Sequence, residues 1–225
     1  MKNTIIIEGK EYKLDGNLNS LKNILFRESG HFSHIELEKS AYFKIRDLAW
    51  QVQIKLGLSS LPTDILDVAH KLGYTTIRMH DSEPFLKNVP EYPELIKREA
   101  FACKCLKDNI IFYNPNYYLP RVRFSIAHEI GHLLLEHNTN LSTDKIETEA
   151  NAFAARLLMP VGVLHALGVK KYTDIMRFCQ VSEPAAIKRM SRIDELRQRG
   201  KFFTSPLERQ ILNNFSEFIK ENKLE

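Results

Sequence analysis

Residues 123–135 read R-F-S-I-A-H-E-I-G-H-L-L-L, within a helical pattern that runs from about Pro120 to about His137. Proline fits the first turn of a helix, where its missing N–H has no partner within the helix. The pattern is apolar on nearly every side, at Val122, Ile126, Ala127, Ile130, Leu133, Leu134 and Leu135. Such a helix is expected to be buried, and a histidine or glutamate within it needs a hydrogen-bond or metal partner.

The motif H-E-I-G-H, residues 128–132, has the spacing of a metal site. His128 and His132 lie four residues apart, on one helix face and about 6 Å apart along the axis, so both imidazoles reach one ion. Glu129 lies beside the first ligand, where its carboxylate can take a proton from water in a hydrolase of the HExxH type. A chain of this composition should contain about 0.02 such motifs by chance.

A catalytic zinc ion usually has three protein ligands and one water, so a third ligand is expected. The metzincin pattern requires glycine at position 135 and histidine at 138; Leu135 and Asn138 exclude that class. His137 lies about 140° around the predicted helix from His132, so it is expected at the surface or behind a ligand.

A second helical motif, E-T-E-A-N-A-F-A-A-R-L-L-M-P at residues 147–160, offers the missing carboxylate. Glu147 and Asn151 share one stripe, whereas Glu149 projects about 200° away from Glu147. Glu147 is the favoured third ligand, with Glu149 or no third ligand left open, and Asn151 is placed to hold the other nitrogen of a ligand histidine. Alanines at 150, 152, 154 and 155 allow the two helices to approach closely.

The rest of the chain predicts a mostly helical α+β protein with a small sheet. Strands are expected at 4–7, 11–14, 75–79, 100–106 and 110–113. Helices are expected at 18–27, 35–56, 64–72, 161–168, 171–179, 183–198 and 206–221. Residues 81–95 contain three prolines and predict a loop. We divide the chain into an N-terminal extension (1–40), a core (41–160) and a helical C-terminal region (161–225).

Composition indicates a protein of the cytoplasm that does not enter a membrane. The three cysteines are too few for a disulfide framework, and their odd number favours a reducing compartment. The N-terminus lacks the apolar segment of a signal peptide, and no stretch approaches the roughly 18 apolar residues of a membrane span.

Residues 170–201 carry nine basic and four acidic residues, and two predicted helices there join at 180–182 like a DNA-binding helix-turn-helix. Basic helical faces are usually only solvated, so DNA binding is the less favoured interpretation. The last predicted helix has an apolar stripe at Leu207, Ile211, Leu212, Phe215, Phe218 and Ile219. The stripe is expected to pack against the chain's own core rather than against a partner.

The two motifs together resemble the ImmA/IrrE family of metallopeptidases. The segments L-P-T-D-I-L-D-V-A-H-K-L-G-Y at 61–74 and Q-V-S-E-P-A-A-I-K-R-M at 180–190 share the resemblance, which covers about 41–198. It implies a zincin-like core with zinc on His128, His132 and Glu147, and Glu129 as the catalytic residue. It also implies a bacterial or mobile-element protein whose substrate is a separate Xre-type helix-turn-helix repressor.

The leading hypothesis is therefore a zinc metalloendopeptidase that cleaves such a repressor and relieves repression. The alternative is a zinc-containing regulator that acts by binding protein or DNA without proteolysis.

Overall fold

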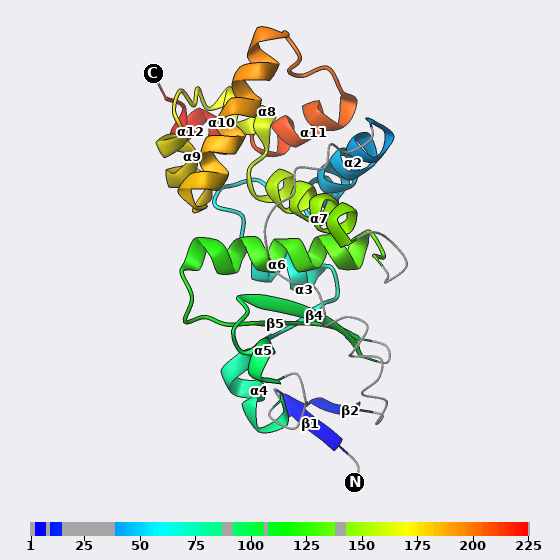
Figure 1. Cartoon of the computed structure of the whole chain (residues 1–225). Helices are drawn as coiled ribbons and strands as arrows, with labels where there is room; N and C mark the ends of the chain where they lie inside the picture. The colour runs from blue at the N-terminus through cyan, green and yellow to red at the C-terminus, as the bar shows by residue number, and fades with distance from the viewer. Residues whose placement is uncertain are drawn as a thin grey trace.

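A computed structural model of the chain describes residues 3–7, 10–14, 39–86, 92–105, 108–137 and 143–224. These residues are mostly helical and include one three-stranded sheet and one separate hairpin, which confirms the α+β class (Figure 1). The short helix expected at 18–27 lies outside the described residues. No helix in the described part of the chain is long and apolar enough to cross a membrane.

The apolar runs before and after residue 107 pair to form most of the larger sheet. Its strands, in the order β3-β5-β4, are β3 (Thr75–Arg78), β5 (Asp108–Tyr113) and β4 (Ala100–Cys105). β4 is antiparallel to β5, whereas β3 is parallel to it. Ile110, Ile111 and Phe112 of the central strand are all buried, so both sheet faces are covered. The hairpin expected near the N-terminus is also present, as β1 (Asn3–Ile7) and β2 (Lys10–Leu14).

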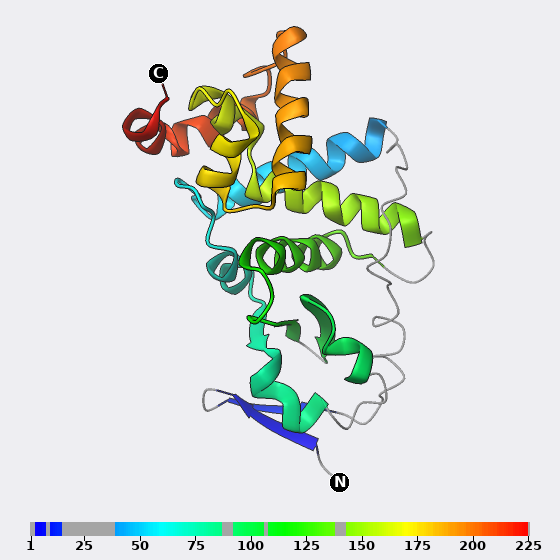
Figure 2. The same ribbon diagram turned by 60° about the vertical axis from the view of Figure 1, so that its left-hand side comes forward.

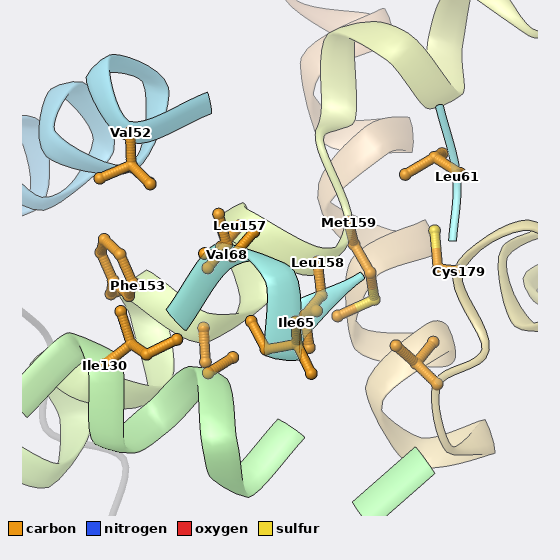
Figure 3. Packing of buried hydrophobic residues seen from close by; sticks show 14 of the residues in the cluster. Val52, Leu61, Ile65, Val68, Ile130, Phe153, Leu157, Leu158, Met159 and Cys179 are labelled. Carbon is orange, nitrogen blue, oxygen red and sulfur yellow. The ribbon is translucent and has the colours of Figure 1, made fainter. Parts of the chain in front are cut away.

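The helices form layers on the sheet. α3 (Ile65–Lys71) and α6 (Leu119–Leu134) lie on one sheet face, and α4 (Met79–Leu86) and α5 (Tyr92–Leu95) on the other (Figure 1). Beyond α6 follow α7 (Thr143–Leu158) and then α2 (Lys39–Lys55), so α7 lies between α6 and α2 (Figure 2). Ile130, Phe153, Leu157, Val68 and Val52 pack together where these helices meet (Figure 3).

The side chain of Gln53 holds the end of α7 against α2. Its amide nitrogen donates to the carbonyl oxygens of Arg156 at 2.9 Å and Leu157 at 3.4 Å. These carbonyls belong to the last turn of α7, where a helix has no internal donors left. A buried glutamine from α2 therefore completes the helix that carries Glu147.

The prediction of a loop over residues 81–95 is wrong, because α4 and α5 occupy most of it. Pro93 lies in the first turn of α5, where a missing N–H costs no hydrogen bond. Pro84 has no backbone N–H to donate, and α4 ends only two residues after it. The proline therefore interrupts the hydrogen bonds of α4 close to the end of the helix. Met79 and Ser82 are buried, and their tertiary contacts outweigh the turn-like composition.

Five helices follow the core and cover the side of α2 and α7 that faces away from the sheet (Figures 1 and 2). They are α8 (Val161–Ala166), α9 (Tyr172–Cys179), α10 (Glu183–Gln198), α11 (Pro206–Asn214) and α12 (Ser216–Asn222). The single helix expected over 206–221 is therefore two. The break at Phe215 buries that side chain and brings Phe218 against Phe178 of α9, with ring centroids 6.2 Å apart.

The prediction that the C-terminal stripe packs on the chain's own core is confirmed. Ile211 and Phe215 belong to the main core, and the backbone N–H of Leu224 donates to the Leu167 carbonyl at 2.8 Å. Deleting residues 204–225 should thus lower the melting temperature by on the order of 10 °C and expose apolar surface to a fluorescent dye. Unchanged melting and dye binding would contradict this packing role.

A point substitution tests the packing of the C-terminal helices without removing any residues. Phe215→Ala should cost about 3–5 kcal/mol, because it leaves a cavity at a fully buried site. Glu217→Ala, two residues away and exposed, should leave the melting temperature within about 1 °C of the wild type.

Candidate metal centre

The HEIGH motif lies in the last two turns of α6, the helix that packs directly on the sheet. Ile126, Ala127 and Ile130 on this helix are at most 2 % exposed. They fix the rotation of α6, so that His128 and His132 face α7. Pro120 lies in the first turn, as its residue type predicts.

Three side chains converge between α6 and α7. Nε2 of His128 lies 2.8 Å from Nε2 of His132 and 3.0 Å from Oε2 of Glu147. Nε2 of His132 lies 3.4 Å from Oε1 of Glu147. All three potential ligand atoms fall within 4.8 Å of one another.

The spacing and the hydrogen bonding of this triad fit a zinc ion. Ligand atoms at about 2.0–2.1 Å from zinc in a tetrahedral arrangement lie about 3.3 Å from one another. The observed distances of 2.8–3.4 Å are near that value. Oε1 of Glu147 is buried and has no hydrogen-bond partner in the described part of the chain, and a cation would satisfy it. Two histidines and one carboxylate also leave a fourth position for water or substrate.

The same contacts shift the pKa values of the ligands. Burial alone would lower the pKa of His128, but its hydrogen bond with Glu147 and the charge of Glu129 raise it above the usual value. Burial would raise the pKa of Glu147, yet the neighbouring imidazoles of His128 and His132 bring it far below its usual range. Histidine and carboxylate side chains bind a metal ion in their deprotonated forms, so a bound dication would compete with protons for these three residues.

Small residues let α6 and α7 approach closely enough to share an ion. A Cβ atom on Gly131 would lie 3.1 Å from Cδ1 of Phe153 and 3.3 Å from the backbone of Ala150. Ala150, one of the alanines noted in the sequence, is fully buried and lies at this contact. Gly131 is a second small residue at the contact, and the motif alone did not indicate its role.

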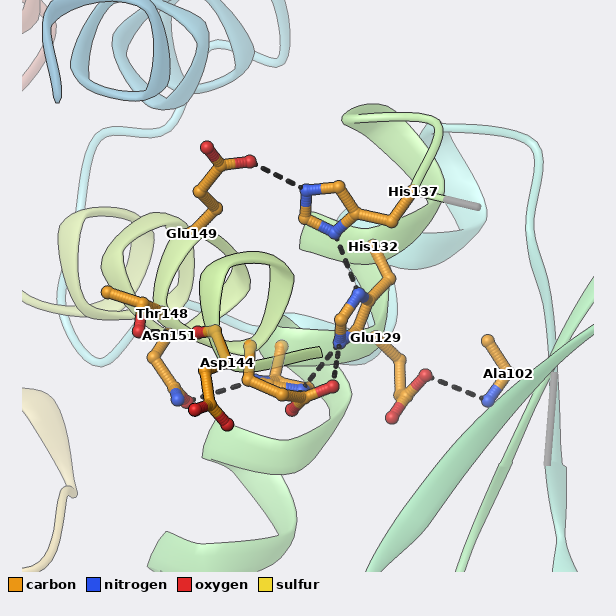
Figure 4. Close-up of polar contacts among 10 residues, drawn as sticks. Ala102, Glu129, His132, His137, Asp144, Thr148, Glu149 and Asn151 are labelled. Carbon is orange, nitrogen blue, oxygen red and sulfur yellow. Dashed lines mark hydrogen bonds and ion pairs between the residues drawn. The ribbon is translucent and has the colours of Figure 1, made fainter. Parts of the chain in front are cut away.

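Glu129 and Asn151 lie on opposite sides of the triad (Figure 4). The carboxylate of Glu129 turns toward the sheet and accepts a hydrogen bond from the backbone N–H of Ala102 on β4 at 3.0 Å. Asn151, one turn after Glu147 on α7, places Oδ1 2.9 Å from Nδ1 of His128. His128 thus donates to the amide through Nδ1 and directs Nε2 at the centre of the triad.

His137 lies behind the candidate ligand His132, which is one of the two positions expected for it, and it is not at the surface. α6 ends at Leu134 and not near residue 137, and Glu136 follows with a left-handed φ of 54°. This reversal returns the His137 ring toward α6, with Nδ1 2.8 Å from Nδ1 of His132 and Nε2 3.0 Å from Oε2 of Glu149. No glycine is present at this helix end, so the residue types there do not predict the reversal. Glu149 therefore contacts His137 and stands apart from the triad.

Several of the basic side chains in residues 170–201 contact other parts of the chain and do not extend freely into solvent. Arg189 is buried, Nη2 of Arg192 donates to the Tyr42 hydroxyl on α2 at 2.7 Å, and Arg197 donates to the Val169 carbonyl. α9 and α10 do form two helices joined at 180–182. Three basic side chains of α10 therefore contact other parts of the chain or are buried within it.

Comparison with known proteins adds one finding to this geometry. A family model described as the IrrE N-terminal-like domain, Peptidase_M78, matches residues 85–191. The match runs from α4 into α10 and contains the triad, Glu129 and Asn151; α2 and α3 lie before it. A search of curated proteins returns no match.

Proposed function

We propose, from the premise that residues 85–191 belong to the Peptidase_M78 family, that this protein is a zinc-dependent endopeptidase. The observation that carries the proposal is the convergence of His128, His132 and Glu147 beside Glu129. The zinc ion, when bound, polarises the peptide carbonyl and makes water acidic enough to attack it at neutral pH.

The chain's own residues supply the proton transfers and the positioning. Glu129 accepts the proton of the attacking water and delivers it to the departing amine, as the general base of an HExxH site. Its hydrogen bond to the Ala102 N–H keeps the carboxylate between the triad and β4. Asn151 holds His128 in the orientation that directs Nε2 at the metal.

The position of β4 supports a protein substrate in an extended conformation. β4 is an edge strand of the described sheet, and the N–H of Ala102 faces away from β5, since it donates to Glu129. An extended peptide that aligns along this edge passes beside Glu129 and the triad. Irregular or helical substrates lack the backbone geometry for such pairing.

We further propose that the substrate is an Xre-type helix-turn-helix repressor, which is a separate protein chain in the same cytoplasm. In this proposal a mobile element encodes both proteins. Support comes from the resemblance of both motifs to peptidases that inactivate such repressors. Cleavage would relieve repression.

The test is incubation of the zinc-loaded protein with the Xre-type repressor encoded beside its gene, followed by mass spectrometry. We expect discrete fragments with one new pair of termini, and none after a chelator has removed the metal. An intact repressor whose DNA binding is nevertheless lost would favour the alternative, a regulator that acts by binding alone.

A further inference from the structure

An unbroken line of hydrogen-bonding groups leads from the metal centre to a second carboxylate. Nδ1 of His132 faces Nδ1 of His137 at 2.8 Å, and Nε2 of His137 faces Oε2 of Glu149 at 3.0 Å (Figure 4). We call His137 and Glu149 the relay pair. Neither residue contributes to the triad.

The relay pair is shielded from solvent. The side chain of His137 is 2 % exposed and that of Glu149 is 13 % exposed. The left-handed residue Glu136 places His137 there, and the position of Glu149 follows from its angle of about 200° from Glu147 on α7. Water therefore competes little for these hydrogen bonds.

The proton positions along this line follow from chemistry. A carboxylate only accepts hydrogen bonds, so Nε2 of His137 carries the proton that Glu149 receives. A neutral imidazole with Nε2–H accepts at Nδ1, so His132 donates from its own Nδ1. Neutral His132 then has its lone pair on Nε2, the atom that faces His128 and Glu147.

The two ligand histidines thus have different hydrogen-bond partners at their Nδ1 atoms. His128 donates to the neutral amide of Asn151, whereas His132 donates through a second histidine to a carboxylate. Partners of this kind fix the tautomer and orientation of a ligand histidine and raise its basicity toward the metal. A carboxylate at the end of such a hydrogen-bonded line raises the basicity of the ligand histidine more than an amide does, because hydrogen bonds to a carboxylate are charge-assisted.

We propose that His137 and Glu149 are positioning residues for the metal centre: they hold His132 in the tautomer that presents Nε2 to the metal and so tighten metal binding. The inference rests on the proposed zinc site. Loss of such a partner typically weakens metal affinity by about 10–100-fold.

The central experiment measures zinc dissociation constants by competition with a chromophoric chelator. His137→Leu keeps an apolar side chain in the buried position but removes the acceptor, and should weaken zinc binding about 10–100-fold. His137→Asn places an amide oxygen near the position of Nδ1, so it should recover most of that loss. His70→Leu is the matched control, since it removes a histidine hydrogen bond of 2.9 Å, to Thr76, away from the site and should leave zinc affinity unchanged.

A double-mutant cycle tests whether Glu149 acts through His137. Glu149→Gln alone should weaken zinc binding, because the amide can donate to His137 and reverse the polarity of the line. In the His137→Leu background the same change should have no further effect on the zinc dissociation constant. Independent, additive effects of the two substitutions would overturn the relay.

Two further measurements distinguish positioning from mere structural support. Nitrogen NMR of the zinc-loaded wild type should show the ring proton of His132 on Nδ1, and the cobalt-substituted His137→Leu protein should have an altered visible spectrum. Melting curves of the metal-free variants report folding separately. An Nε2–H tautomer at His132, or equal zinc affinity in His137→Leu and wild type, overturns the proposal. A wild type that binds no zinc would instead refute the proposed function.

Discussion

Glu129→Gln is expected to retain one zinc ion per chain while cleaving the repressor about 10²–10⁴-fold more slowly than the wild type. The amide keeps the size of the side chain and leaves all three ligands in place, but it cannot accept the proton of water. Zinc content is measured by elemental analysis, and cleavage by the rate of fragment formation.

Glu136→Gln provides the control for this substitution. It makes the same chemical change on an exposed residue just past the end of α6, and cleavage should not change. If Glu129→Gln relieves repression in cells as fully as the wild type does, catalysis is not the mode of action. The protein would then act by binding.

Replacing a ligand should abolish metal binding itself. His128→Ala, His132→Ala and Glu147→Ala each leave two ligands, and the zinc content should fall from one ion per chain to almost none after dialysis. Glu149→Ala is the matched control on the same helix, because Glu149 contacts His137 and not the centre of the triad. It should retain zinc at saturating metal, with lower affinity. If Glu149→Ala loses zinc while Glu147→Ala retains it, the third ligand is Glu149 and not Glu147.

Most of the sequence-based predictions that the structure confirms depend on helical periodicity. The spacing of His128 and His132 and the shared stripe of Glu147 and Asn151 needed only the helical repeat, and the structure brings these side chains together at hydrogen-bonding distances. The extents of α3, α9 and α10 could likewise be predicted to within two residues. A local repeat predicts a local element, and here the local elements carry the ligands.

Contacts that depend on the end of a helix or on another element could not be predicted. The reversal at Glu136 uses a left-handed non-glycine residue, so its residue type does not predict the reversal. The sequence therefore left open whether His137 lies at the surface or behind a ligand. The hydrogen bond from Ala102 to Glu129 joins a strand to a helix 27 residues later, through a backbone group that every residue type possesses. α4 and α5 form despite their prolines because buried contacts stabilise them.

The position of α2 has a consequence for synthesis of the protein. Gln53 on α2 bonds to Arg156, 103 residues later in the chain, and α2 also packs against α11, which is made later still. At about 5–20 residues per second, α2 leaves the ribosome roughly 5–20 s before the end of α7 exists. During that interval Ile45, Ala49 and Val52 lack the surfaces of α7 and α11 that pack against α2 in the folded chain. We therefore expect the nascent chain to expose these apolar side chains during the delay, and the three side chains of the candidate metal centre can come together only after it.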